Sequence, residues 1–98
     1  MSKTDIIERI SFFRTRAKLS QKALSIAIDM NIGYINRLES KKDFLPSLES
    51  LLKIIAVCSC TEEEFFYRDI SKYPNDKIII DKIQTLPQDK RDAILKLI

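Results

Sequence analysis

The sequence predicts an all-α protein, and three observations support this class. The chain has 98 residues with only one glycine and three prolines, so it lacks the turn residues that a many-stranded fold needs. Long stretches are rich in Leu, Ile, Ala, Lys and Glu, which favour helices. Apolar residues recur at intervals of three and four, the spacing of one helix face. A chain of this length forms one domain, or one small domain with an appendage.

The first predicted helix covers residues 4–18, with Thr4 in a position to cap it. Its apolar face consists of residues three and four apart, namely Ile6, Ile7, Ile10, Phe13 and Ala17. Ser20 caps a second, short helix, whose apolar residues are Ala23, Leu24, Ala27 and Ile28.

A third helix is expected to start near Asn31, whose side chain can accept a hydrogen bond from the first turn. Asp29 and Met30 form a tight connection to it, and Ile35 and Leu38 lie on its inner face. Two short helices separated by such a turn form a helix-turn-helix pattern, here over residues 20–38.

Two further helices follow a polar loop that Pro46 closes. The fourth covers residues 47–57, with an apolar stripe of Leu48, Leu51, Leu52, Ile55 and Ala56. Thr61 and Glu64 form a capping box that opens the fifth helix, from which Phe65 and Phe66 enter the core.

The C-terminal part is expected to be a helical hairpin joined by a linker. Residues 71–76 combine a helix breaker with turn formers, which predicts a linker with a boundary near Pro74. Pro87 stands at the first position of a second hairpin helix. The two apolar stripes are Ile79, Ile83 and Leu86, and then Ala93, Ile94, Leu97 and Ile98. Residues 77–80 could also form a strand, but no partner strand is visible.

The composition argues against several classes of function. Histidine is absent, which removes the commonest general base and metal ligand. Cys58 and Cys60 are too few for a zinc site or a disulfide framework, so we interpret them as reduced thiols that pack as small apolar residues. No apolar run is long enough for a membrane span, and the first residues do not form a signal peptide. We expect a non-enzymatic cytoplasmic protein with no metal, cofactor, membrane partner or evident small-molecule ligand.

The basic residues are concentrated in the first part of the chain. Residues 1–60 carry a net charge of +4 and residues 61–98 a net charge of −1. This excess is a weak indication of a nucleic-acid partner.

Residues 19–39 read LSQKALSIAIDMNIGYINRLE and resemble the phage-repressor (Xre or Cro-like) helix-turn-helix DNA-binding family. The residues at the family's spacings are Gln21, Leu24, Ser25, Ala27, Ile35, Leu38 and Glu39, and the likeness extends to Phe66. It implies a five-helix DNA-binding domain over residues 1–71 and a transcriptional regulator, in all expectation a repressor, that binds double-stranded DNA. The helix starting near Asn31 would lie in the major groove. Asp29 departs from the family, which usually has a turn glycine there.

The resemblance also assigns individual residues. The residues that would face bases are Ile32, Gly33, Asn36 and Arg37, and those that would contact phosphates are Gln21, Asn31, Tyr34, Lys41 and Lys42. Arg16, Lys18 and Lys22 are candidates for flanking phosphate contacts. The planar fork of Arg37 matches O6 and N7 of guanine. Because Ile32 and Gly33 cannot hydrogen-bond a base, direct readout rests on Arg37 and Asn36, or DNA shape is read, or the protein has another partner. Arg14 and Glu39 align with a structural ion pair of the family.

Members of the family typically bind DNA as dimers, which predicts a homodimer. Residues 75–98 are the expected dimerisation element, with Ile79, Ile83, Leu86, Ile94 and Leu97 at the interface. The alternative is that this hairpin packs back on the first helix of its own chain. Two other functions compete with DNA binding: a protein-interaction module, such as an antitoxin-like or anti-regulator subunit, and an enzyme such as a nuclease. The apolar Ile32 and Gly33 favour the former, and the lack of histidine disfavours the latter.

Overall fold

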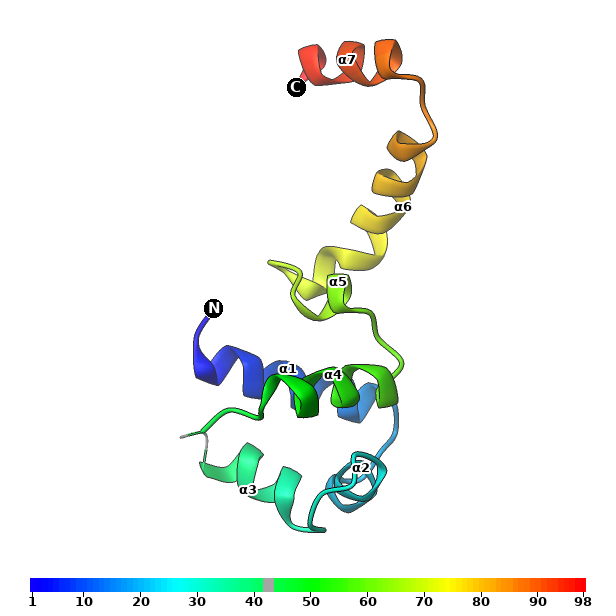
Figure 1. Cartoon of the computed structure of the whole chain (residues 1–98). Coiled ribbons are helices and arrows are strands. Elements are labelled where there is room, and N and C mark those ends of the chain that lie inside the picture. The colour runs from blue at the N-terminus through cyan, green and yellow to red at the C-terminus, as the bar shows by residue number, and fades with distance from the viewer. Residues whose placement is uncertain (42–43) are drawn as a thin grey trace. The chain divides into compact units, whose positions relative to one another are not determined.

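The computed structural model describes residues 1–41 and 44–98, apart from the side chain of Lys41, and all regular elements among them are helices, as predicted. These residues divide into two compact units, Met1–Phe66 and Tyr67–Ile98, which we call unit 1 and unit 2. Unit 1 contains α1 (Lys3–Arg16), α2 (Gln21–Ala27), α3 (Tyr34–Lys41), α4 (Leu48–Val57) and α5 (Glu62–Phe65) (Figure 1). Unit 2 contains a 3-10 helix, η1 (Ile70–Lys72), followed by α6 (Tyr73–Gln84) and α7 (Gln88–Leu97).

Helix α1 begins with a reciprocal cap that the sequence analysis placed wrongly. Ser2, and not Thr4, is the capping residue: its hydroxyl accepts a hydrogen bond from the backbone N–H of Asp5 at 3.1 Å. The Asp5 carboxylate in turn accepts one from the backbone N–H of Ser2 at 2.8 Å. Both groups satisfy N–H donors that a helix start leaves free, which extends α1 to Lys3.

The core of unit 1 lies between the inner faces of its five helices. Phe13 of α1 and Phe65 of α5 pack together with ring centroids 5.6 Å apart, and both are fully buried. The other buried apolar residues of this unit are Ile7, Ile10, Leu24, Ile28, Tyr34, Ile35, Leu38, Leu51, Ile54, Ile55 and Cys58. These side chains come from all five helices, so each helix is fixed against the same core.

Some of the apolar positions predicted for the fourth and fifth helices are exposed. Phe66 is 45% exposed, because α5 is a single turn and consecutive helix residues point about 100° apart. On α4, Leu48 and Leu52 face solvent, as does Ala56, whereas Ile54 is buried. The buried residues of α4 are therefore Leu51, Ile54 and Ile55, of which Leu51 and Ile55 belong to the predicted stripe.

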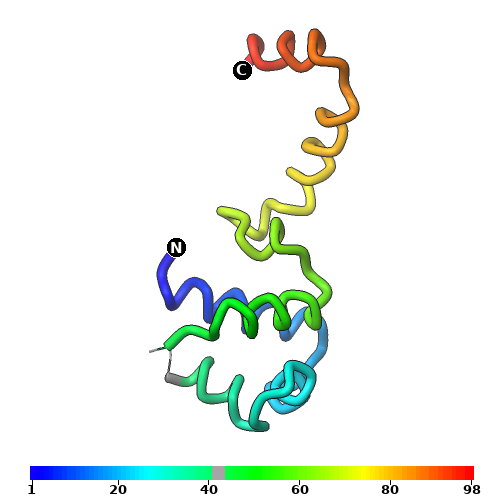
Figure 2. Tube along the Cα trace, viewed as in Figure 1, coloured from blue at the N-terminus to red at the C-terminus, as the bar shows by residue number. Residues whose placement is uncertain are grey.

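Helices α2 and α3 form the helix-turn-helix. Ser20 caps α2 as predicted, its hydroxyl accepting from the backbone N–H of Ala23 at 2.9 Å. Figure 2 shows α2 nearly end-on while α3 lies across the view, so the two helices cross steeply. Ser25 joins them: its buried hydroxyl donates to the Gln21 carbonyl at 2.8 Å and accepts from the backbone N–H of Ile35 at 3.0 Å. A side chain of α2 thus satisfies a backbone donor in the first turn of α3.

Helix α3 starts later than predicted. Asn31 lies in the turn before it, where its side-chain oxygen accepts from the backbone N–H of Gly33 at 2.9 Å. Its carbonyl accepts from the backbone N–H of Tyr34, also at 2.9 Å. Asn31 therefore shapes the entry to the helix, and regular α3 begins at Tyr34.

Three helix ends in unit 1 carry a residue in the left-handed conformation, and none of these residues is glycine. Lys18, Asp29 and Ser59 have φ angles of 59°, 60° and 59°. Each follows the C-cap of its helix, where glycine is usually found because it has no Cβ. Asp29, which departs from the family pattern, thus keeps the glycine-like backbone of that turn.

The linker predicted over residues 71–76 is wrong. Residues 71–76 are helical: they include the end of η1 and the first turn of α6, where Pro74 is tolerated because the first N–H groups need no partner within the helix. The break between the units follows Phe66 and is not near Pro74. Tyr67 donates to the carboxylate of Asp76 at 2.6 Å, which ties the start of the unit to α6.

The two long helices of unit 2 form as predicted, with little burial. Residues 77–80 lie within α6, so the strand alternative is wrong. Pro87 is the N-cap of α7 and not its first residue. The Arg91 guanidinium donates to the carbonyls of Ile83, Gln84 and Leu86 at the end of α6. Among the described residues of this unit, Tyr73 alone is buried.

Candidate nucleic-acid interface

The outer face of α3 is the candidate surface for DNA. Gly33, Asn36, Arg37 and Ser40 follow one another at helical spacing, on the side opposite the buried Ile35 and Leu38. Asn36 and Arg37 are exposed, and Ile32, just before the helix, is 57% exposed. Within the described residues the Arg37 guanidinium has no hydrogen-bond or ion-pair partner, so its donors are available to a ligand.

The residues predicted to contact phosphates differ in their exposure. Tyr34 is only 7% exposed and its ring packs edge-on against Phe44, with centroids 6.3 Å apart. The aromatic ring of Tyr34 is therefore part of the core, and a phosphate contact from this residue stays a prediction. Asn31 is exposed and Gln21 is half-buried at the start of α2. Lys42 and the side chain of Lys41 lie outside the described residues.

A largely buried ion pair holds the base of this surface. Arg14 Nε and Nη2 donate to the two carboxylate oxygens of Glu39, at 2.8 and 3.0 Å, in the bidentate geometry that arginine favours. Arg14 Nη1 also donates to the Leu19 carbonyl at 2.9 Å. The side chains are 16% and 11% exposed, and the hydrogen bonds to Glu39 raise the pKa of Arg14. The structure thus contains the pair that the resemblance implied, joining α1 to the end of α3.

From this pair a line of hydrogen bonds leads outward to the face of α3. Gln21 Nε2 donates to Glu39 Oε1 at 3.2 Å, and Gln21 Oε1 accepts from Asn36 Nδ2 at 2.9 Å. Neither hydrogen bond was predicted from the sequence. Gln21 and Asn36 are 15 residues apart on different helices, so only the crossing of α2 and α3 brings them together.

A second ion pair fixes α5 to α1. Arg16 Nη1 and Nη2 donate to the Glu64 carboxylate at 2.7 and 2.9 Å, and its guanidinium lies over the Phe13 ring at 4.7 Å from the centroid. These bonds raise the pKa of Arg16. Arg16 is 40% exposed but already paired, so it is a weaker candidate for a phosphate contact than the sequence suggested. The sequence predicts that Glu64 forms a capping box with Thr61. Thr61 does accept from the backbone N–H of Glu64 at 3.1 Å, but the Glu64 side chain pairs with Arg16 instead of the backbone of Thr61.

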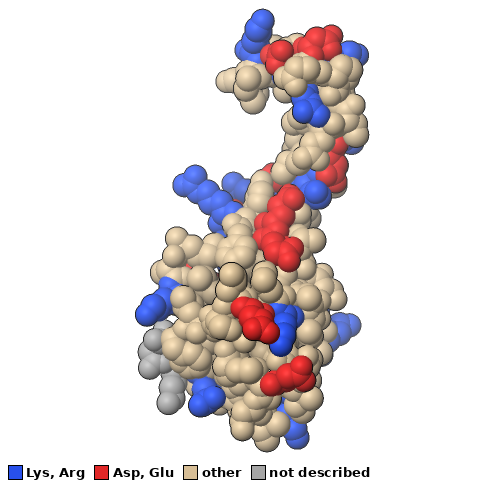
Figure 3. Space-filling view, viewed as in Figure 1, with Lys and Arg blue, Asp and Glu red and all other residues tan. Residues whose placement is uncertain are grey.

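Basic side chains of unit 1 are spread out. On the face shown in Figure 3, its lysines and arginines lie at separate points around the outline and do not gather into one patch. Lys18 and Lys22 are exposed and lie on either side of Ser20, the start of α2. On this face charge does not mark a path for DNA, so the candidate interface rests on α3 and its supporting residues.

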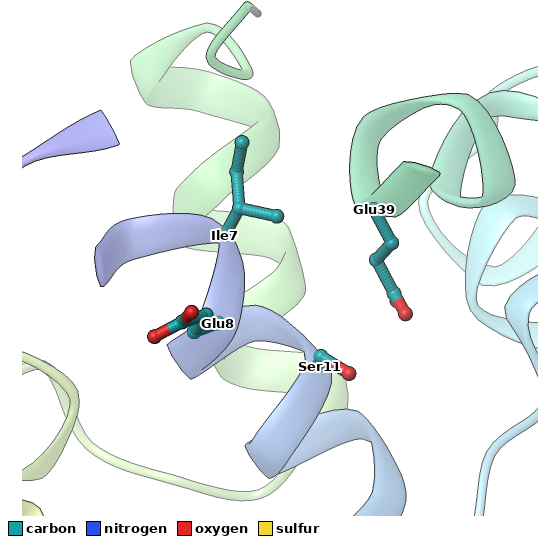
Figure 4. Close-up of a pocket in the computed structure, with 4 residues that line it drawn as sticks. All are labelled: Ile7, Glu8, Ser11 and Glu39. Carbon is teal, nitrogen blue, oxygen red and sulfur yellow. The ribbon is translucent and has the colours of Figure 1, made fainter. Parts of the chain in front are cut away.

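A pocket of about 210 Å³ lies on the side of α3 that faces α1. Its lining includes Ile7, Glu8, Ser11 and Glu39 (Figure 4). Figure 4 shows Glu39 pointing from α3 toward α1. Of its two carboxylates, that of Glu39 is already paired with the Arg14 guanidinium.

Gly33 lies at the start of that surface, although the backbone does not require glycine there. It does not have a positive φ, and a Cβ added to it would meet only the side-chain oxygen of Asn31, at an ordinary contact distance of 3.5 Å. The one glycine of the chain is thus absent from the left-handed turns and present on the exposed face of α3. Glycine at such a position permits a close approach of a ligand.

The two cysteines take no part in this surface. Cys58 is buried at the end of α4 and Cys60 is half-buried, and both are free thiols. Burial raises the pKa of Cys58, and burial with the neighbouring Cys58 raises the pKa of Cys60 to about 11. Both sulfurs are thus held in the protonated, weakly nucleophilic form.

The described residues also lack two features that would indicate other functions. Residues 1–41 and 44–98 contain no group of three or more His, Cys, Asp or Glu side chains arranged to hold a metal ion. None of the helices that the structure describes is both long and apolar enough to cross a membrane.

The fold and this surface define a helix-turn-helix protein with an outward-facing third helix. A profile described as "Helix-turn-helix" matches residues 10–65, more than half of the chain, and the chain belongs to this phage-repressor (Xre/Cro-like) family of DNA-binding regulators, which is generally non-enzymatic. The match runs from the second half of α1 to the end of α5. No curated protein and no solved structure matches the chain significantly.

Proposed function

We propose that this protein is a sequence-specific transcriptional repressor of the cytoplasm, which binds DNA as a homodimer with α3 of each protomer in the major groove. The observation that carries the proposal is the outward face of α3. Its exposed Asn36 and Arg37 stand on a helix that the buried Arg14–Glu39 pair and Ser25 hold rigidly. Rigid placement of polar side chains on a groove-sized helix is what base readout requires.

The proposed contacts follow from that placement. Arg37 donates to a guanine, Asn36 contacts a neighbouring base, and Ile32 and Gly33 approach the groove closely. Gln21 and Asn31, at the starts of α2 and of the turn into α3, contact phosphates, and Lys22 adds a cation beside them.

Unit 2 supports the proposed dimer. It exposes large apolar side chains that nothing else in the unit covers, namely Ile78, Ile79, Leu95, Leu97 and Ile98, at 56% to 95% exposure. Ile83, Leu86 and Ile94 are partly exposed beside them. Two copies of the unit would bury these residues against each other, which makes residues 75–98 the dimerisation element of the proposal and residues 1–71 its DNA-binding part.

The proposal is tested with the full chain and a pool of random duplexes at low salt. Selected duplexes should contain two half-sites, and the logarithm of the affinity should fall steeply with the logarithm of the salt concentration. Arg37→Ala should reduce the discrimination between bases at one position of each half-site by about 1–3 kcal/mol. Absence of affinity for any duplex at low salt would refute DNA binding.

The dimer has its own test. Ile79→Lys and Leu97→Lys change exposed positions, so they should leave the fold intact and shift the chain to a monomer in sedimentation experiments. Lys82→Glu, which reverses an exposed charge on the same helix as Ile79 without changing the apolar surface, serves as the control. An unchanged molecular mass for both apolar variants would contradict the assignment.

One observation favours a second candidate, a protein-interaction module. Ile32 is a large apolar residue that is 57% exposed at the head of α3. Such a residue is suited to an apolar partner surface as well as to a thymine methyl group. The salt titration separates the two candidates, because release of phosphate counterions gives DNA binding its steep dependence.

A further inference from the structure

We infer that Asn36 recognises an adenine, and that Gln21 positions the Asn36 amide for this by hydrogen bonds that start at the Arg14–Glu39 pair. The inference rests on the proposed function and adds the base that one residue reads. We call the connected side chains Arg14, Glu39, Gln21 and Asn36 the relay.

The direction of every hydrogen bond in the relay is fixed by the chemistry at its buried end. A guanidinium has only donors, so both carboxylate oxygens of Glu39 must accept from Arg14. A carboxylate paired in this way has only acceptors, so Gln21 must turn its NH₂ group toward it. The amide oxygen of Gln21 then points the other way, toward Asn36.

This orientation determines what Asn36 offers to DNA. Its Nδ2 must donate one hydrogen to Gln21 Oε1, at 2.9 Å. One N–H and the amide oxygen of Asn36 stay available on the exposed face of α3. The side chain therefore presents one donor and one acceptor side by side, and the amide cannot flip without facing its oxygen toward that of Gln21.

Adenine is the base whose major-groove edge complements this pair. It offers the N6 amino donor and the N7 acceptor, so both groups of the amide form a hydrogen bond. Guanine offers two acceptors, which would place O6 against the amide oxygen. Cytosine and thymine each offer one polar group and satisfy half of the pair.

The role of Gln21 is to exclude guanine. Without it, Asn36 could turn both of its N–H groups toward the two acceptors of guanine. Because Gln21 holds one of them, the residue is a positioning residue in addition to any phosphate contact made through its second N–H. The structural ion pair thereby extends its influence to base choice.

The experiment uses the full chain and a duplex selected from a random pool. The base pair read by Asn36 is the position at which Asn36→Ala reduces the preference for one base. Affinities are then measured for all four base pairs at that position, at one salt concentration. The expected base is adenine, preferred by about tenfold or more in the wild type, and the preference disappears in Asn36→Ala. Gln21→Ala should reduce the adenine-over-guanine ratio at the same base pair.

Controls separate positioning from general binding. Lys22→Ala, an exposed change next to Gln21, should lower all four affinities by the same factor. Gln21→Met keeps the side-chain length, and it should give the same loss of adenine preference if Gln21→Ala does not fold. A double variant of Gln21 and Asn36 should show no greater loss of preference than Asn36→Ala alone.

Two outcomes would overturn the inference while leaving the proposed function intact. One is that the position at which Asn36→Ala reduces base preference does not prefer adenine in the wild type. The other is a uniform loss of affinity in Gln21→Ala with an unchanged adenine-over-guanine ratio. A wild-type chain that selects no duplex would instead overturn the proposed function, and the inference with it.

Discussion

Removal of the Arg14 side chain should destabilise unit 1 strongly, through the charge that it leaves behind. In Arg14→Ala, Glu39 loses both of its arginine hydrogen bonds and keeps the one from Gln21 Nε2, which is long at 3.2 Å. The Leu19 carbonyl loses its donor as well. Because the Glu39 side chain is only 11% exposed, water cannot fully replace these partners.

The expected loss is about 3 kcal/mol, the lower end of the range for a broken buried pair, because both side chains keep some access to water. For a protein of this size, each kcal/mol shifts the melting midpoint by about 4–8 °C, so a fall of about 12–24 °C should follow. Urea unfolding at pH 7, followed by circular dichroism, measures the change.

Lys53→Ala is the control, since Lys53 pairs with Glu49 on the surface of α4 and both side chains are exposed, at 46% and 81%. It should cost less than about 1 kcal/mol. A double replacement, Arg14→Met with Glu39→Leu, should recover much of the stability because no unpaired charge remains. If Arg14→Ala costs no more than Lys53→Ala, the account of the Arg14–Glu39 pair as a buried structural element is wrong.

Three further predictions follow from the turns, the single glycine and the thiols. Asp29→Gly should raise the free energy of unfolding by about 0.5–1 kcal/mol, because residue 29 has a φ of 60°, and a loss of stability in urea unfolding would contradict this. Gly33→Ala should leave stability unchanged or slightly raised, since its Cβ fits at 3.5 Å, but should weaken binding to the selected duplex; equal affinity would refute a close approach at Gly33. Burial raises the pKa of Cys60 to about 11, so the folded state retains its proton longer than the unfolded state, and stability should fall as pH rises from about 9 to 11. Cys60→Ala should lack that part of the alkaline loss, and identical pH profiles for the two proteins would contradict the predicted burial of the thiol.

The elements that the sequence predicts well are those set by local chemistry. Ser20 and Thr61 accept hydrogen bonds at their helix starts because capping depends on a residue and the backbone three positions on. The Arg14–Glu39 pair was implied by the resemblance and not by spacing. The linker predicted around Pro74 is wrong because proline in the first turn of a helix and proline in a linker look the same in a sequence.

What the sequence could not provide depends on tertiary geometry. The bond between Gln21 and Asn36 requires the steep crossing of α2 and α3, which no local pattern encodes. The exposure of Phe66 depends on α5 ending after one turn, and the burial of Tyr34 depends on its contact with Phe44. The base-reading set was predicted as a list of exposed positions, whereas the hydrogen bonds that orient one of them appear only in the folded chain.

The central claim is that α3 binds in the major groove of DNA. Methylation of guanine N7 takes place in that groove, so protection of a selected duplex from methylation by the full chain tests the claim most directly. The account predicts two protected clusters about 34 Å apart along the duplex, one for each protomer, and loss of guanine protection with Arg37→Ala. Binding that leaves every N7 reactive would contradict it.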